Sequence, residues 1–225
     1  MTPLSLGIEC SNPGAGASVA LARHDDDALA LVARRELERG ARGTDALVRT
    51  IAAMVADAGA APRDITRLAV SVGPGGYTAL RVGVAASGAI GRALGCALVP
   101  VPTPAAAAQS LGEGDRPALV ALASKGARAH ASVVDRDGRV RALGVVDASA
   151  LERAAVGVLV GDEHMPEPFR ETARALGMRV LPLTLDGWAC LRAARGRASV
   201  EPGALRVRYA REPDAVTQWR ARREG

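Results

Sequence analysis

The stretch that decides the fold reads Val72-Gly73-Pro74-Gly75-Gly76-Tyr77-Thr78-Ala79-Leu80-Arg81-Val82-Gly83. An apolar run ends here in clustered glycines, and a pattern typical of an α-helix follows them. Pro74 fixes one φ angle, while the glycines permit positive φ angles and the close approach of other groups. The stretch therefore predicts a strand, a tight turn and a helix, in which backbone N–H groups and the positive end of the helix dipole can face an anion.

Two interpretations of this glycine turn stay open on the residues alone. The turn matches neither the P-loop pattern nor the GxGxxG pattern, so its chemistry does not by itself define a nucleotide site. The alternative is a structural turn that packs tightly against a neighbouring segment.

The chain has 225 residues, of which 48% are hydrophobic, which is enough for one sizeable core or two smaller lobes. Its net charge of +5 is compatible with nucleic-acid binding, but an Arg-rich composition is equally typical of proteins from GC-rich genomes. The aromatic residues are scattered along the chain, so no stacking platform for bases can be identified. They are Tyr77, Phe169, Trp188, Tyr209 and Trp219.

The three cysteines, Cys10, Cys96 and Cys190, lie far apart and in no CxxC pattern. This excludes a disulfide framework or zinc knuckle and predicts thiols in a reducing cytoplasm. The first residues show no signal-peptide pattern. The apolar stretch from Val82 to Val99 contains Arg92 and four glycines, so we expect a core helix and a buried strand there, and no membrane span.

Hydrophobic patterning predicts two similar halves. In the first, strands are expected at 4–8, 17–23, 29–36, 68–72 and 97–99, with helices at 44–58 and 80–94. After a Pro- and Ala-rich connector at 100–117, the second half has predicted strands at 118–123, 129–134, 139–146, 156–160 and 179–181. Helices are expected there at 148–154, 166–176 and 186–195. The repeated order βββαβαβα predicts an α/β protein of two lobes, residues 1–103 and 104–225, the second with a basic tail.

The glycine turn resembles the signature of the TsaB (YeaZ) family. That signature reads GPGS[FY]TG[LV]R[IV]G, where brackets enclose alternative residues at one position. Gly76 and Ala79 depart from that signature, which usually has Ser and Gly there. The segment Val207 to Arg211 resembles the motif that the family carries near its end, P-x-Y, L or V, then R. The resemblance implies a two-lobed actin-like ATPase fold, also called ribonuclease H-like.

In active actin-like proteins, one acidic residue follows the first strand and another begins the matching loop of the second lobe. Glu9 stands at the first position, but the second falls in Ala123-Ser124-Lys125, which has no carboxylate. The resemblance thus implies a vestigial nucleotide-binding site, made of Glu9, Ser11, Gly73, Gly75, Gly76 and Thr78. The other interpretation of Glu9 is a structural carboxylate that caps a turn.

No catalytic or metal-binding residues are expected in this chain. Its three histidines, His24, His130 and His164, form no HExxH or HxxxH pair. Ser71 and Ser87 lack the GxSxG pattern of a serine nucleophile.

Gly83, Ser87 and Gly91 form a ridge of small residues at helical spacing, which permits close approach of another segment. That segment is either the protein's own sheet or a partner helix. In the TsaB family, the helices matching 44–58 and 80–94 form the surface that joins TsaD or a second TsaB copy. The resemblance therefore implies a partner interface made of Leu47, Val48, Ile51, Val55, Gly83, Ser87 and Gly91.

From Ala189 onward the chain has nine Arg and four acidic residues, so this segment carries the whole net charge. Such a tail is either solvated, or it docks on an acidic partner or on tRNA phosphates.

The resemblance implies a non-catalytic subunit, without a cofactor of its own, that supports a TsaD-type enzyme in making N6-threonylcarbamoyladenosine at position 37 of tRNA. The enzyme would bind a metal and threonylcarbamoyl-adenylate. The expected partners are this TsaD-like subunit, a TsaE-like ATPase, tRNA through the complex, and a second copy when the chain is alone. We expect no membrane association. The alternatives are an autonomous ATPase or small-molecule kinase of the same fold, and a stand-alone homodimeric interaction module.

Overall fold

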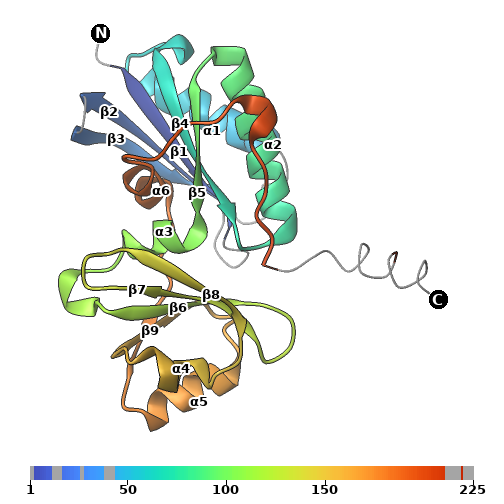
Figure 1. Cartoon of the computed structure of the whole chain (residues 1–225). Coiled ribbons are helices and arrows are strands. Elements are labelled where there is room, and N and C mark those ends of the chain that lie inside the picture. Colours follow the sequence, from blue (N-terminus) through green and yellow to red (C-terminus); the bar gives the residue numbers. More distant parts are fainter. Residues whose placement is uncertain (1–2, 12–16, 26–27, 38–43, 211–218, 220–225) are drawn as a thin grey trace.

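The chain folds into two α/β lobes, one above the other in Figure 1. The computed structural model describes residues 3–11, 17–25, 28–37, 44–210 and 219. The part of the predicted basic tail that follows Ala210 therefore lies outside the described residues, except for Trp219.

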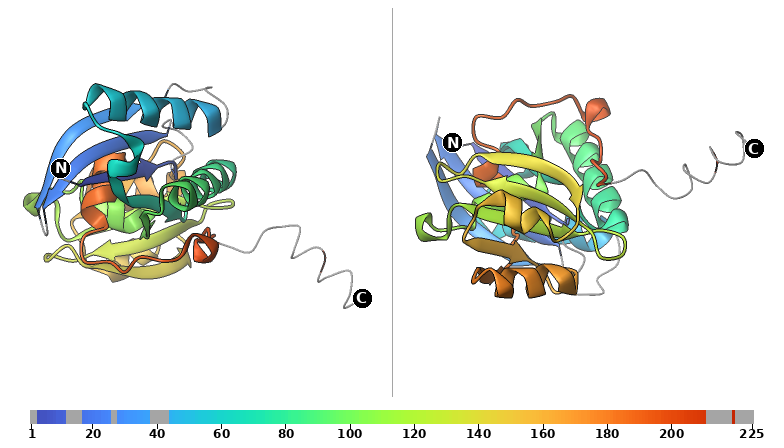
Figure 2. Two further views of the ribbon diagram at one scale, coloured as in Figure 1. Left: turned by 90° about the horizontal axis from the view of Figure 1, so that it is seen from above. Right: turned by 60° about the horizontal axis from the view of Figure 1, so that its bottom comes forward.

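The first lobe is a five-stranded sheet with the strand order β3-β2-β1-β4-β5. Helices α1 and α2 pack on one face of this sheet and α6 on the other (Figures 1 and 2). Gly59 and Gly95, at φ +64° and +65°, follow α1 and α2 in the left-handed conformation typical of helix ends. The elements are β1 (Leu4–Glu9), β2 (Ser18–Asp25), β3 (Ala28–Glu36), α1 (Thr44–Asp57), β4 (Ile65–Gly73), α2 (Tyr77–Leu94), β5 (Ala97–Pro102) and α6 (Gly187–Ala193).

The second lobe repeats this arrangement in the order β10-β9-β6-β7-β8. In each sheet the first three strands form an antiparallel meander, and the fourth strand pairs in parallel with the first. The repeat confirms the predicted duplicated α/β fold of two lobes. The elements are β6 (Ala118–Ala123), β7 (Ala129–Val134), β8 (Val140–Val146), α4 (Ala150–Ala154), β9 (Val158–Gly161), α5 (Glu167–Ala175) and β10 (Arg179–Pro182).

All ten predicted strands are present, and the main error lies in the connector between the lobes. Helix α3 (Thr103–Ala108) forms where the prolines predicted an irregular segment. Pro104 sits in its first turn, a position that tolerates proline because the N–H there has no helical acceptor. Short 3-10 turns at Pro62–Asp64, Glu113–Asp115 and Pro202–Ala204 were also not predicted.

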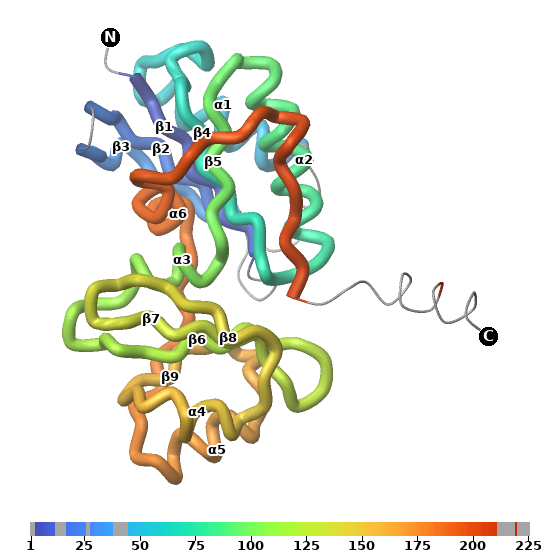
Figure 3. Tube along the Cα trace, in the orientation of Figure 1, coloured from blue at the N-terminus to red at the C-terminus, as the bar shows by residue number. Residues whose placement is uncertain are grey.

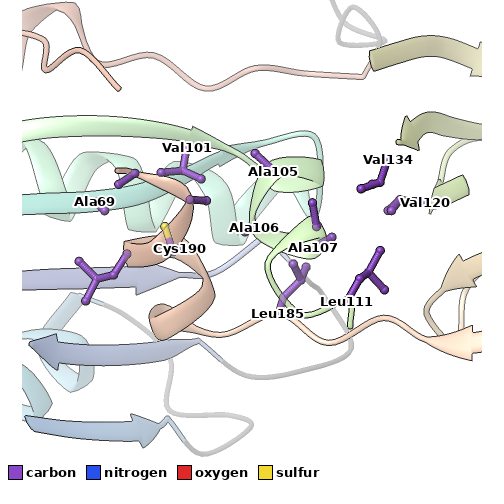
Figure 4. Close-up of a cluster of buried hydrophobic side chains, with 14 of the residues drawn as sticks. Ala69, Val101, Ala105, Ala106, Ala107, Leu111, Val120, Val134, Leu185 and Cys190 are labelled. Carbon is purple, nitrogen blue, oxygen red and sulfur yellow. The ribbon is translucent and has the colours of Figure 1, made fainter. Parts of the chain in front are cut away.

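Helix α3 lies at the centre of a hydrophobic cluster that joins the two lobes (Figure 4). Its buried alanines meet Ala69 and Val101 of the first sheet and Val120 and Val134 of the second, all within one cluster. Leu185, in the segment that leads back to the first lobe, completes it. The lobes therefore share a core.

The predicted boundary between the lobes needs correction, because the chain returns to the first lobe from α6 onward. Gly7 of β1 and Gly187 of α6 lie so close that a Cβ on Gly7 would be 2.1 Å from the carbonyl oxygen of Gly187. After α6, residues 198–210 form a segment that we call the C-terminal strap, which runs along α2 (Figure 3). Val200 N donates to Leu98 O at 2.7 Å, and Arg208 N donates to Val72 O at 2.6 Å.

The apolar stretch from Val82 to Val99 forms part of α2 and β5, as expected. Within the described ranges, no helix combines the length and the apolar character needed to cross a membrane.

Candidate functional site

A cavity of about 150 Å³ lies between the lobes, at the carboxyl ends of strands from both sheets. Ligands of open α/β sheets bind at this edge, so the cavity is the natural candidate site. From the first lobe it is lined by Ser11, Gly75, Gly76 and Thr103, and from the second by Leu122, Ala123, Asp162, His164, Leu183 and Leu185.

The glycine turn is packed tightly against two other segments of the chain. Gly73 has φ +107°, and a Cβ there would lie 2.3 Å from the carbonyl oxygen of Arg208 in the strap. A Cβ on Gly75 would lie 2.2 Å from the carbonyl oxygen of Ser11. The N–H of Gly76 donates to the same Ser11 oxygen at 2.8 Å, so it does not point to a ligand. This geometry favours the interpretation as a structural turn.

Glu9 is buried at the end of β1 and does not line the cavity. Its Oε1 accepts hydrogen bonds from the backbone N–H of Ser11, at 2.6 Å, and from the Ser11 hydroxyl. Its Oε2 has no hydrogen-bond partner among the described residues. Burial raises the pKa of this carboxyl, and the bonds from Ser11 only partly oppose that effect. These contacts favour the interpretation of Glu9 as a carboxylate that caps the turn.

The structure thus brings only half of the predicted vestigial site to the cavity. Ser11, Gly75 and Gly76 line it. Gly73 lies behind the turn, against the strap, and Thr78 is exposed on the first turn of α2. Nucleotide binding by this set stays a prediction.

Asp162 is a cavity residue that the sequence reasoning missed. It follows β9 directly, and its Oδ1 accepts a hydrogen bond from the backbone N–H of His164 at 2.9 Å. The resemblance placed the second-lobe carboxylate position in the loop after β6, at Ala123 to Lys125, which has none. The sequence did contain a signal for Asp162, which is an acidic residue just after a short buried strand. Parallel neighbours such as β6 and β9 end at the same edge of a sheet, so residues after either strand can reach the same cavity.

The residues present do not fit a metal centre. Across the described parts of the chain, no group of three or more His, Cys, Asp or Glu side chains is close enough to hold a metal ion. Burial lowers the pKa of His24 and of His130, which belong to different lobes. The three cysteines are free and buried, and burial raises the pKa of Cys10 to about 12, so its thiolate form is disfavoured.

The ridge on α2 faces the protein's own sheet, which corrects the prediction that it meets a partner. A Cβ on Gly83 would lie 2.0 Å from Cys10 Sγ, and a Cβ on Gly91 would lie 2.5 Å from Leu98 Cδ2. Ser87 is completely buried. The small residues are needed because α2 lies directly against β1 and β5.

Three of the four predicted interface residues on α1 are also buried in the first-lobe core: Leu47, Ile51 and Val55. The resemblance implied a partner contact here, but the spacing of these apolar residues is that of a stripe that faces the core, so they lie on the wrong side of the helix for a partner. Val48 is exposed. The exposed sides of these two neighbouring helices carry small residues at four-residue spacing, which we call the alanine face: Val48, Ala52, Ala56, Ala85, Ala89 and Ala93.

Comparison with known proteins agrees with this architecture. A Pseudomonas aeruginosa protein with similarity to the peptidase YeaZ is 18% identical, with a TM-score of 0.70 over 93% of this chain and 100% of that chain. YeaZ from Pseudomonas aeruginosa is 19% identical, with a TM-score of 0.68 over 92% of this chain and 99% of that chain. These likenesses establish the shared fold. Comparison with curated proteins found no match.

The family model described as "TsaD: tRNA N6-adenosine threonylcarbamoyltransferase" matches residues 42–178, which is more than half of the chain. The matched region runs from just before α1 to just after α5, so it includes the glycine turn, α3 and the cavity residues Leu122, Ala123, Asp162 and His164. The chain therefore belongs to the TsaD family, and it has the YeaZ fold that the resemblance to the TsaB (YeaZ) family implied.

Proposed function

We propose that this chain is a TsaB-like, non-catalytic subunit that supports a TsaD-type enzyme in forming N6-threonylcarbamoyladenosine in tRNA. Its membership of the TsaD family supports the role in this modification, and its YeaZ fold supports the TsaB-like position within it. The enzyme would supply the metal and threonylcarbamoyl-adenylate, and this chain would need no cofactor.

The main support for the proposal that this subunit is non-catalytic is the geometry of the interlobe cavity. Its volume of about 150 Å³ is small compared with the roughly 300–1,000 Å³ of pockets that enclose drug-sized ligands. Leu122, Leu183 and Leu185 occupy its second-lobe side. On the first-lobe side, the carboxyl of Glu9 is buried behind Ser11 and bonded to it. Little room and no facing pair of carboxylates remain for a metal-bound nucleotide.

The core shared between the lobes supports the same proposal. Kinases and related enzymes close their lobes around a substrate, which requires a hinge with few buried contacts. Here the alanines of α3 and Leu185 are buried between both sheets, so opening the cavity would expose apolar area. A subunit of fixed shape is suited to holding a partner in a productive geometry, which can raise turnover without supplying a reacting group.

The alanine face is the surface that we propose for the TsaD-type partner, and for a second copy when the chain is alone. Its small side chains allow the backbone of a partner helix to approach closely, and Val48 adds apolar area that is exposed in the monomer. In this proposal a TsaE-like ATPase joins the resulting complex, tRNA binds to it, and the assembly works in the cytoplasm.

The function is tested by reconstitution with the TsaD-type protein of the same cell. The mixture should modify tRNA, and each protein alone should not. Steady ATP hydrolysis by the isolated chain, lost on Glu9→Ala, would instead favour the autonomous ATPase or kinase. Failure of any TsaD-type protein to bind, with a stable homodimer present, would favour the stand-alone interaction module.

The partner surface is tested with two variants and their matched controls. Ala89→Trp and Val48→Asp should prevent assembly in light scattering while the fold is kept, because both side chains are exposed on the alanine face. Ala175→Trp and Leu176→Asp make the same changes at exposed second-lobe positions and should leave assembly intact. Equal assembly by all four variants would show that the alanine face does not bind the partner.

A further inference from the structure

The fold brings together two of the chain's five aromatic residues at an exposed position. Tyr77 begins α2 and Tyr209 lies near the end of the strap, yet their rings stack with centroids 5.0 Å apart and an interplanar angle of 27°. Arg81 lies over the Tyr77 ring at 4.4 Å, and its Nε donates to the Tyr209 hydroxyl at 3.0 Å. Tyr77 is 43% exposed and Tyr209 is 37% exposed. We call these three residues the tyrosine cluster.

The two segments that carry the tyrosine cluster, α2 and the strap, are basic and almost free of acidic residues. Between Asp64 and Glu113, a stretch that includes all of α2, the sequence contains no Asp or Glu. The strap contributes Glu201 as its one acidic residue. In the part of the chain that the structure describes, no carboxylate pairs with the exposed arginines of this surface. These are Arg81 of α2 and Arg206 and Arg208 of the strap.

The other possible role of the stacked tyrosines is to hold the strap on α2. That role would not require exposed arginines beside the rings. The strap is already attached by the bond from Arg208 N to Val72 O and by the buried side chain of Leu205. Exposed rings beside arginines that have no acidic partner among the described residues are instead the combination that proteins use for single-stranded nucleic acid. There the rings stack on bases and the guanidinium groups contact phosphates.

We propose that the tyrosine cluster and its flanking arginines bind a single-stranded segment of RNA, with a base stacked on the exposed tyrosine rings and neighbouring phosphates on the arginines. The inference rests on the proposed function and deepens it, because it names the surface of this chain that contacts tRNA. The tyrosine cluster lies at the beginning of α2, whereas Ala85, Ala89 and Ala93 lie further along the helix. Because Ala89 and Ala93 lie about two helical turns or more beyond Arg81, an RNA segment at the cluster and a protein partner at that end of the alanine face can bind at the same time.

The test is fluorescence anisotropy with the full chain and a labelled single-stranded RNA of roughly ten nucleotides, a length within the range that such surfaces bind. An abasic strand of equal length and charge serves as the second probe. The intact RNA should bind more tightly than the abasic strand. Tyr209→Leu should weaken RNA binding by roughly tenfold, as expected for the loss of one stacked base, and should leave abasic binding nearly unchanged.

Two further variants separate stacking from folding and from charge. Tyr209→Phe keeps the ring and should retain binding. Arg81→Met should weaken binding and reduce its dependence on salt, whereas Arg141→Met removes an exposed charge on β8 and should have little effect. Thermal unfolding of each variant verifies that the fold is kept.

Equal binding of the RNA and the abasic strand would overturn the inference, as would RNA binding by a folded Tyr209→Leu variant that matches the unchanged protein. If Tyr209→Leu lost assembly with the partner but kept RNA binding, the tyrosine cluster would be a protein contact, and the inference would also be overturned. Because Ala89→Trp should lose assembly and keep RNA binding, failure of this inference is distinguishable from failure of the proposed function.

Discussion

Replacing Gly83 by Ala should destabilise the monomer, although alanine is the better helix former. The added Cβ would lie 2.0 Å from Cys10 Sγ, far inside van der Waals contact. Cys10 is itself buried at the end of β1, so its side chain has little room to move away. Overpacking of this kind costs about 1–3 kcal/mol in the free energy of unfolding.

Gly88 of the same helix provides the matched control. A Cβ there would have one neighbour, Pro202 O, at an ordinary distance of 3.8 Å. Gly88→Ala should therefore gain up to about 1 kcal/mol from helix propensity alone. Gly83→Ala has the same gain but also the steric cost, so the two variants should differ by about 1–3 kcal/mol, or about 2–12 °C in Tm.

Urea unfolding of both variants measures this difference directly. Adding Cys10→Ala removes the Sγ that the new methyl group meets, so the pair should show a coupling energy when Cys10→Ala alone is also measured. If Gly83→Ala proved as stable as Gly88→Ala, the ridge would not be packed on β1. The interpretation as a partner surface would then regain its support.

Two further predictions concern the buried carboxyl and the shared core. Glu9→Gln should keep an acceptor for Ser11 and flatten the pH dependence of stability. Burial raises the pKa of Glu9 in the folded state above the ordinary value of 4.5. The contribution of Glu9 to stability is therefore full below pH 4.5 and is lost as the pH rises through the folded-state pKa. If Glu9→Gln left the pH profile of urea unfolding unchanged, this prediction would be contradicted. Leu185→Ala should lower the free energy of unfolding by about 2–5 kcal/mol in a single transition, because the cluster is shared by both lobes; separate calorimetric transitions would show independent lobes.

The order of strands and helices was predictable from the sequence because it depends on local patterns. Alternating or continuous apolar residues predicted all ten strands. A strand needs apolar side chains on each face that is buried, and this requirement is the same whichever strand it pairs with. Gly59 and Gly95 follow α1 and α2 with left-handed φ angles, so the ends of these helices also depend on local residues. The repeat of the two halves followed from the same patterns.

The use of particular residues was decided by contacts between segments far apart in the chain. The resemblance implied an interface at Gly83 and Leu47, but both residues pack on their own sheet. Apolar spacing shows which side of a helix is buried but not what covers it. The return of α6 to the first lobe carries the strap to Gly73, whose missing side chain makes room for Arg208 O.

The same return of the chain brings Tyr209 onto Tyr77, across more than half of the sequence. Asp162 likewise enters the interlobe cavity only because β9 pairs in parallel with β6. Local patterning therefore determined the elements and their order, since each element's own residues satisfy its backbone and its buried face. The tertiary structure alone decided the cavity, the exposed sides of α1 and α2 and the tyrosine cluster, because each depends on the packing of segments that no local pattern relates.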